Sequence, residues 1–393
     1  MVPTKEIIQI FKRQLIPISL YLFVNGLFVF KYFSRAGVDP LVSLSIYIVS
    51  ILIALFSFYS LADKISEKTY KVTYWSILIV MVLIIIGALV FIDPYSIRVD
   101  RWSALSFFWD NFLQGKYPYS AHTHVSLTNY PSPFPLWHAI NFPFYLMGDV
   151  GIGLIFFLIL TVYFVRYFFS SYRKSILFII MLCFSPAYWW EVAVRSDALN
   201  NAFLVFILIL WLTKSGRSIS NSFFLIAIVC GLISSTRLTA IIPLALYFFK
   251  PYLQLPCKQK IVFLTVVLAT FSLVFSPFVF WDTNTWIFFT RNPFMSQADK
   301  GNIYIFISMI ILGCIMALQW KNIQQFFNIT SLFIFIFMLL SQIGLIYADG
   351  AKNNLFSDYI CDISYFSLLL PYCLVSLENN FTIESKESLL IHN

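Results

Sequence analysis

The side chains best suited to chemistry gather in one polar stretch, residues 93–133, which separates two long apolar runs. Asp100 stands there, directly before a segment whose apolar residues recur at helical spacing. A single carboxylate held beside a substrate hydroxyl can act as a general base, so we predict that Asp100 is a catalytic residue. The structural alternative is a helix N-cap, a position that Asp also favours.

A set of arginines could bind an anionic group such as phosphate. Guanidinium groups form charge-assisted hydrogen bonds with phosphate and stabilise negative charge that develops during a reaction. The alternative is that these cations reach lipid headgroups at a membrane surface. The candidates are Arg98, Arg101, Arg195 and Arg237.

Further polar and aromatic side chains are predicted to line a substrate cavity. Each has a structural alternative. Asp93 could begin a turn before Pro94, Asp197 could pair with Arg195, and Glu191 could stand at the end of a span. The two tyrosines could anchor the protein at the membrane interface. The candidates are Asp93, Glu191, Asp197, Tyr119 and Tyr130.

Metal ligands and reactive thiols are weakly represented. His122 and His124 have a spacing that occurs in metal sites, but the sequence offers no third ligand for them. The six cysteines show no paired spacing and fall mostly in apolar runs, which favours buried thiols. We therefore assign no residue as a metal ligand.

The composition indicates what kind of scaffold must position these residues. Of 393 residues, 60% are hydrophobic and 11% are charged, whereas a soluble domain is about 45–50% apolar and about 25% charged. So few charges could not cover the surface of soluble domains in a chain of this length. The composition disfavours a soluble enzyme, a disordered protein and a nucleic-acid-binding protein, and it favours an integral membrane protein.

We predict an all-α bundle of about 12 transmembrane helices, within a range of about 10–13, because each span needs ~20 apolar residues. Residues 218–249 contain one charge, Arg237, and are flanked by basic residues on both sides, so we expect a hairpin with Arg237 at its outer apex. The predicted spans are 15–30, 41–61, 72–92, 150–168, 175–190, 198–213, 218–236, 238–256, 261–280, 302–319, 326–346 and 361–377.

The distribution of basic residues predicts the orientation. With the N-terminus inside, 16 of the 26 Lys and Arg residues lie in inner segments, as the positive-inside rule requires. The net charge of +8 is therefore a topology signal. We predict one transmembrane domain over 1–377, cytoplasmic N- and C-termini with a tail at 378–393, and an outer face that carries 93–133 and Arg237.

The outer loop is predicted to carry two helices that lie along the membrane surface, at about 100–114 and about 134–147. The first has an apolar stripe at helical spacing. The second follows from the number of crossings. Residues 134–165 contain one charge and connect the outer loop to inner basic residues, so they must cross the membrane an odd number of times. One span from about 150 then leaves about 134–147 as a surface helix. The stripe consists of Trp102, Leu105, Phe108, Trp109, Phe112 and Leu113.

Three motifs resemble those of the GT-C class of membrane glycosyltransferases, and most closely those of bacterial polyprenyl-phosphate-mannose-dependent mannosyltransferases. Two later motifs are Arg195-Ser196-Asp197-Ala198-Leu199 and Gly231-Leu232-Ile233-Ser234-Ser235-Thr236-Arg237-Leu238-Thr239. The loop motif comprises Asp100, then Leu113-Gln114-Gly115-Lys116-Tyr117-Pro118-Tyr119, Tyr130-Pro131-Ser132-Pro133 and Pro135-Leu136-Trp137.

This resemblance covers roughly residues 72–250. It implies transfer of a hexose such as mannose from a polyprenyl-phosphate donor to a glycan, lipid or protein acceptor, on the outer face of a bacterial inner membrane. It implies that Asp100 is the base and that the arginines named above surround the donor phosphate. The chain differs in having more than one span before the loop and a lone Asp in place of an acidic pair, which leaves a divalent metal open as a cofactor.

The main alternative is a polytopic transporter or flippase without catalytic activity. Ion-coupled transport normally needs ionisable residues inside the spans, whereas almost every charge here falls in a loop. An O-antigen polymerase or ligase usually has its large outer loop late in the chain, and a noncatalytic membrane scaffold is a further alternative.

Overall fold

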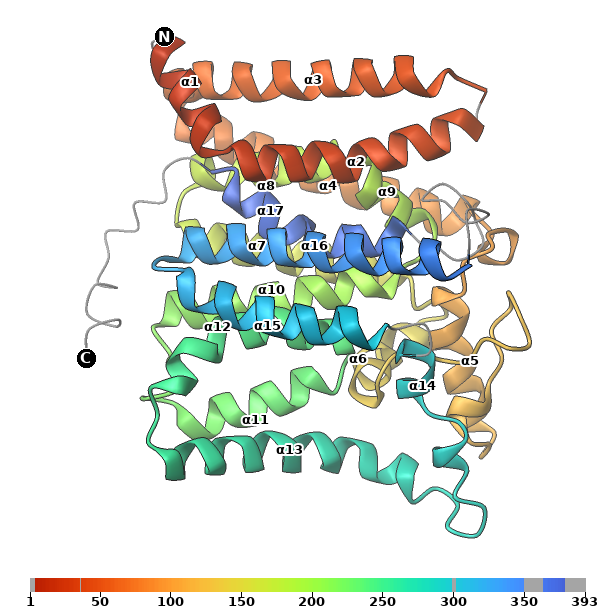
Figure 1. The fold of residues 1–393 in the computed structure, drawn as a ribbon. Coiled ribbons are helices and arrows are strands. Elements are labelled where there is room, and N and C mark those ends of the chain that lie inside the picture. The colour runs from red at the N-terminus through yellow and green to blue at the C-terminus, as the bar shows by residue number, and fades with distance from the viewer. Residues whose placement is uncertain (1–3, 36, 299–301, 350–362, 379–393) are drawn as a thin grey trace.

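The computed structural model describes residues 4–35, 37–298, 302–349 and 363–378. All secondary structure in these residues is helical. No strand occurs among these residues. In Figure 1 the long helices lie beside one another with roughly parallel axes. The prediction of an all-α helical bundle is confirmed for this part of the chain.

Seven described helices are long and apolar enough to cross a membrane. They leave large apolar side chains exposed around the bundle, as in Leu41 and Ile46, Ile79 and Leu83, and Leu268. Lipid is the environment in which such a surface is stable. The helices are α2 (Leu15–Arg35), α3 (Pro40–Leu61), α4 (Glu67–Phe91), α7 (Ile152–Phe169), α10 (Asp197–Ser215), α13 (Cys257–Val279) and α16 (Ile323–Asp349).

Shorter apolar helices accompany these seven, namely α11 (Phe223–Ser234), α12 (Leu238–Leu253), α15 (Ile303–Gln319) and the pair η5–α17 (Ile363–Leu369 and Leu370–Ser376). The expected span at 361–377 is therefore a 3₁₀ segment followed by one short α-helix, and its first two residues lie outside the described chain. The count of about twelve spans stays a prediction.

The span predicted at 175–190 is not one straight helix. It divides into α8 (Tyr172–Cys183) and α9 (Pro186–Ala193), which are bent by 62°. Proline favours the first turn of a helix and disrupts a continuous one. The Ser185 hydroxyl accepts a hydrogen bond from the Tyr188 amide at 3.2 Å, so a new helix begins at this point.

The bundle has two distinct ends. Gln14 donates to the Glu378 carbonyl at 3.4 Å, and Tyr59 donates to the Leu377 carbonyl at 2.7 Å, so both described termini lie at one end. The predicted tail lies outside the described residues except for Glu378. The short helices α5 (Arg101–Leu113), α6 (Pro135–Leu146) and α14 (Pro293–Ala298) gather at the opposite end, which we call the loop end (Figure 1).

Helices α5 and α6 begin and end within one residue of the bounds expected for the two loop helices. The apolar stripe of α5, which was expected to lie against the membrane surface, is largely buried in the protein. Leu105, Phe108 and Trp109 are buried, whereas Phe112 and Leu113 at its end are exposed. The stripe packs against the bundle and the adjoining loop rather than against headgroups, because α6 and the end of α13 offer it aromatic partners such as Phe142 and Phe278.

Helix α10 runs from the loop end through the bundle and is largely buried along its length. It begins after Ser196, whose hydroxyl accepts from the Ala198 amide at 3.3 Å, and it ends at Gly216 in the left-handed conformation. Its first residue is Asp197, a favourable place for a carboxylate because the positive end of the helix dipole lies there.

Candidate functional site

The loop before α6 docks on the turn that joins α11 to α12. The Phe134 amide donates to the Thr236 carbonyl at 2.9 Å, and the Leu136 amide donates to the Ser235 carbonyl at 3.2 Å. The turn is short because α11 ends at Ser234 and α12 begins at Leu238. The expected pair of helices with Arg237 in the turn between them is therefore present, and this turn is covered by the loop before α6 rather than open to its surroundings.

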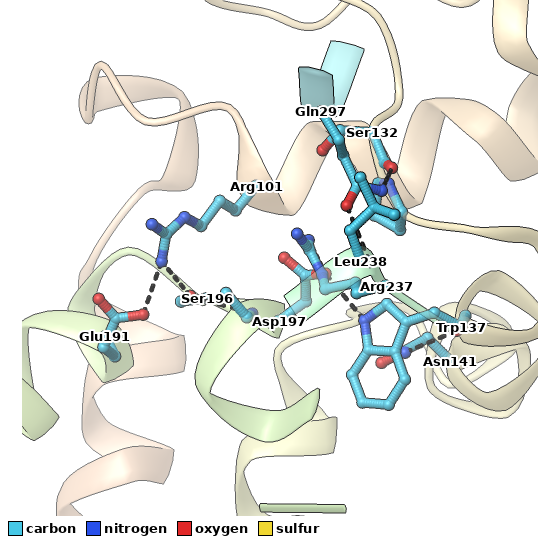
Figure 2. A network of polar contacts seen from close by, with 12 residues as sticks. Arg101, Ser132, Trp137, Asn141, Glu191, Ser196, Asp197, Arg237, Leu238 and Gln297 are labelled. Atoms are coloured by element: carbon cyan, nitrogen blue, oxygen red, sulfur yellow. Dashed lines mark hydrogen bonds and ion pairs between the residues drawn. The ribbon is translucent and has the colours of Figure 1, made fainter. Parts of the chain in front are cut away.

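Arg237 makes a buried ion pair with Asp197 at the start of α10 (Figure 2). Its Nε lies 3.1 Å from Asp197 Oδ2, and its Nη2 contacts the same oxygen. The indole of Trp137 on α6 donates to this oxygen as well, at 2.8 Å. Both charged side chains are less than one-tenth exposed. Three donors from α6 and the α11–α12 turn thus converge on one carboxylate oxygen of α10.

A second buried ion pair joins α5 to α9. Arg101 Nη1 lies 2.7 Å from Glu191 Oε2 and 2.6 Å from the Ser196 hydroxyl (Figure 2). Its guanidinium also lies over the Tyr365 ring, 5.2 Å from the centroid. Glu191 is fully buried. These two predicted site residues therefore bind each other, and the pair anchors the start of α5.

Arg195 is held by structure rather than presented to a substrate. Its Nη1 pairs with Asp149 Oδ2 at 2.5 Å, and its Nη2 donates to the Leu89 and Ile92 carbonyls at 2.8 Å. Its backbone is left-handed, with φ of +50°. Carbonyls at the end of a helix lack hydrogen-bond donors within that helix. Arg195 donates to two such carbonyls at the end of α4. Arg195 therefore pairs with Asp149 rather than with Asp197, and its role as a ligand of a donor phosphate stays a prediction.

Asp100 begins α5 without capping it through its side chain. Its carboxylate instead accepts a hydrogen bond from Asn129 Nδ2 at 3.1 Å, and it is partly exposed. Its backbone carbonyl accepts the first helical bond, from the Ala104 amide at 2.8 Å. The N-cap alternative is therefore wrong for the side chain, and the carboxylate is directed toward the loop that contains Asn129.

Two other candidates in the same loop lie at its surface. Asp93 accepts from the Tyr95 amide at 3.0 Å and begins the 3₁₀ turn η2 (Pro94–Ser96), so it acts as the turn residue that was its structural alternative. Arg98 is exposed between that turn and α5. Neither residue takes part in the buried ion pairs.

The two predicted sugar-stacking tyrosines differ. Tyr119 is fully buried, donates to the Pro133 carbonyl at 3.1 Å and packs edge-on against Phe108, so it supports the loop and offers no open face to a sugar. Burial raises the pKa of its hydroxyl well above the usual range. Tyr130 is only partly buried, and the Arg291 guanidinium covers its ring at 4.0 Å from the centroid.

The histidine pair is used for structure. His124 contacts the Ser103 hydroxyl at 2.6 Å through Nδ1 and the Ile97 carbonyl at 3.0 Å through Nε2, so both ring nitrogens are taken. His122 lies beside Tyr130. Among the described residues, no three His, Cys, Asp or Glu side chains lie close enough together to hold a metal ion.

Several residues of the site were not predicted. Trp137 stands in the loop motif but was given no role, and Gln297 carries no charge and has partners that are distant in sequence. Gln297 on α14 bridges two elements: its Nε2 donates to the Ser132 carbonyl at 2.5 Å and its Oε1 accepts from the Leu238 amide at 3.1 Å (Figure 2). Asp149 was visible as the single charge of its segment, a signal that could have marked it as a partner for a cation.

His138 was missed as well. It stacks on the Phe108 ring at 3.6 Å between centroids, inside the cluster that holds α5 on α6. Burial, reinforced by the nearby Arg237 charge, lowers its pKa well below the usual value. A lone His on an apolar helix gives no sequence signal for such a position.

A narrow cavity lies in the bundle directly beyond the Arg237–Asp197 pair. Asp100, Arg195 and Arg237, which were expected to line one common cavity, are not among its lining residues. It is bordered by α10, α12, α16, η5 and α17, and its lining residues are Asn201, Ala202, Val205, Thr239, Ala240, Ile242, Pro243, Ile334, Met338, Leu368 and Tyr372.

No protein-family model, curated protein or solved structure matches this chain. What the site does must therefore follow from its geometry and its chemistry.

Proposed function

We propose that this protein is a membrane glycosyltransferase that moves a sugar from a polyprenyl-phosphate donor to a glycan, lipid or protein acceptor. One observation carries the proposal. The partly exposed carboxylate of Asp100 and the convergent donors around Arg237 lie at the same end of an apolar helical bundle. In the proposed reaction this end supplies the base and the cation that binds the phosphate.

The proposed reaction uses the two groups in different roles. The Asp100 carboxylate accepts the proton of an acceptor hydroxyl while that oxygen bonds to the anomeric carbon of the donor sugar. The bond between the anomeric carbon and the phosphate oxygen breaks, and the electron pair leaves with polyprenyl phosphate. Arg237 then stabilises the phosphate charge through charge-assisted hydrogen bonds. No step of the proposal uses a metal ion.

The proposal includes a membrane arrangement. The bent pair α8–α9 and the shorter helices α11, α12, α15 and η5–α17 each cross once together with the seven long helices, which gives twelve spans. The N- and C-termini are cytoplasmic, and the loop end faces outward in a bacterial inner membrane. The 16 basic residues predicted inside support this orientation.

Substitution of Asp100 tests the proposal. Asp100→Asn keeps the shape of the side chain and its ability to accept from Asn129, but it removes the basic oxygen. We expect transfer of a radiolabelled sugar from polyprenyl-phosphate-mannose by the purified protein in nanodiscs to fall by ~10²–10⁴-fold, the usual contribution of a general base.

Asp93→Asn is the matched control, because it alters a carboxylate that only begins a nearby turn, and it should leave transfer unchanged. Wild-type transfer by Asp100→Asn would show that Asp100 is not the base. Absence of transfer by the wild-type protein from every polyprenyl-phosphate sugar offered would count against the glycosyltransferase itself.

A transporter or flippase is the second candidate, and the cavity in the bundle favours it. Asn201 and Tyr372 are among the residues that line this cavity, and Asn201 Nδ2 and the Tyr372 hydroxyl have no hydrogen-bond partner among the described residues. A fluorescent lipid-phosphate that changes leaflet in proteoliposomes without any sugar transfer would favour this function.

A further inference from the structure

The donors that the proposed function assigns to the lipid phosphate are already occupied by the protein's own oxygens. Asp197 Oδ2 accepts from Arg237 Nε, Arg237 Nη2 and Trp137 Nε1. At the first turn of α12, the Leu238 amide donates to Gln297 Oε1 at 3.1 Å. Such a set of convergent donors would suit a phosphate oxygen equally well, since phosphate and carboxylate favour the same charge-assisted bonds.

A second place for the Asp197 carboxylate lies one helical turn away. Residues four apart on a helix share a face, so Asn201 follows Asp197 on the same side of α10. Asn201 Nδ2 is buried and has no partner among the described residues, and Asp197 Oδ1 likewise has none. Asn201 is also one of the residues that line the narrow cavity.

We propose that Asp197 is a switch: it closes the anion site on Arg237 when no phosphate is bound, and it turns to Asn201 when a phosphate takes its place. The inference rests on the proposed function, because it concerns the phosphate site assigned there. A buried arginine left without a partner is costly, so the exchange is feasible only because one anion replaces another. The incoming group is a phosphate ester, whose charge at least equals that of the carboxylate.

Equilibrium binding of phosphate tests the switch. The probes are a radiolabelled polyprenyl monophosphate in phosphatidylcholine nanodiscs and, separately, inorganic phosphate, which distinguish a lipid phosphate from a free one. Asp197→Asn removes the competing charge but can still accept from Trp137, so it should bind the lipid phosphate roughly tenfold more tightly than wild type. Asn201→Leu removes the alternative partner and should bind it more weakly.

Asp149→Asn is the matched control. It removes the same charge and releases another buried arginine, Arg195, which keeps its two carbonyl partners, so it should leave phosphate binding unchanged. Thermal unfolding of each variant separates altered binding from misfolding. Equal gains in Asp197→Asn and Asp149→Asn, or no gain in Asp197→Asn, would overturn the switch.

Arg237→Gln distinguishes failure of the switch from failure of the proposed function. It should weaken binding of the lipid phosphate at least tenfold if Arg237 is the phosphate ligand. Wild-type binding by this variant would remove the phosphate site itself. Weaker binding in Arg237→Gln together with unchanged binding in Asp197→Asn would retain the site and reject the switch alone. Tighter binding of inorganic phosphate only, with the lipid phosphate unchanged, would reject a lipid phosphate as the occupant.

Discussion

At the scale of single residues, the loop end is organised by arginine–carboxylate pairs. Arg101 binds Glu191, Arg195 binds Asp149 and Arg237 binds Asp197, and five of the six side chains are nearly inaccessible. Removing one partner of such a pair leaves a buried charge that typically costs about 3–5 kcal/mol. Each pair therefore fixes which elements meet, and in the Arg237 pair three donors converge on a single carboxylate oxygen.

The buried histidine of α6 should make stability depend on pH. The pKa of His138 in the folded protein lies below its usual value, so the unfolded chain binds the proton more tightly. Stability is therefore full above a pH of about 6.5, the ordinary His value, and is lost as the pH falls below it. We expect the wild-type melting temperature in detergent to fall between neutral and mildly acidic pH.

His138→Phe keeps an aromatic ring against Phe108 and should reduce this acid sensitivity. Tyr119, whose ring lies 5.8 Å away between centroids, and Arg237 also lie near His138. Burial raises the pKa of the Tyr119 hydroxyl well above its usual range, so Tyr119 does not supply the slope. An unchanged pH dependence in the variant would assign the acid sensitivity to other groups.

At the scale of elements, the turn that carries Arg237 depends on the close packing of α11 against α13. Gly231 lies in the last helical turn of α11, just before the connection to α12. A Cβ atom there would come within 2.6 Å of the Val267 carbonyl oxygen and 2.7 Å of Thr270 Cβ. Small residues at helix contacts in membranes allow such close approach. Gly231 is thus needed for α11 and α13 to lie this close together.

Gly231→Ala should force α11 away from α13 and shift the start of α12. Overpacking of this kind typically costs about 1–3 kcal/mol, which thermal unfolding in detergent can measure, and donor binding should weaken with it. Gly87 on α4 is the matched control, because a Cβ there meets no atom within 4 Å. Gly87→Ala should be neutral or slightly stabilising. Equal effects of the two substitutions would contradict a packing role for Gly231.

At the scale of the whole molecule, the bundle separates a terminal end from the loop end that carries the site. The basic residues Lys214 and Arg166 lie in the last turns of α10 and α7, at the ends of these helices opposite the loop end. The arginine–carboxylate pairs lie at the loop end. This polarity along the helix axes is what the positive-inside rule predicts for a protein whose loop end faces outward.

Cysteine labelling of intact cells tests this orientation. Ser126 lies in the loop between α5 and α6, and Cys257 is exposed at the start of α13. In a background whose other cysteines are serine, an impermeant maleimide should label Ser126→Cys and spare Cys257 until the membrane is permeabilised. The reverse result would place the proposed site in the cytoplasm and exclude a donor on the outer face.

The sequence by itself determined the class of the fold and the residues that carry charge at the site. Apolar runs of ~20 residues suffice to indicate membrane helices, because every backbone polar group in lipid must be bonded within its own segment. Charged side chains are scarce in such a chain, and Asp100, Glu191, Asp197 and Arg237 were therefore easily recognised as candidates. The apolar stripe also predicted the bounds of α5, and the required number of membrane crossings predicted those of α6.

Only the tertiary structure decided the partners of these residues. Arg195 pairs with Asp149 rather than with Asp197, and Trp137 and Gln297 enter the site from distant segments. Ion pairing in a bundle depends on which helix ends lie close together, and the hydrophobic pattern of each helix is compatible with many arrangements. The apolar stripe of α5 could suit either lipid or protein, and the aromatic residues of α6 and α13 made protein its partner.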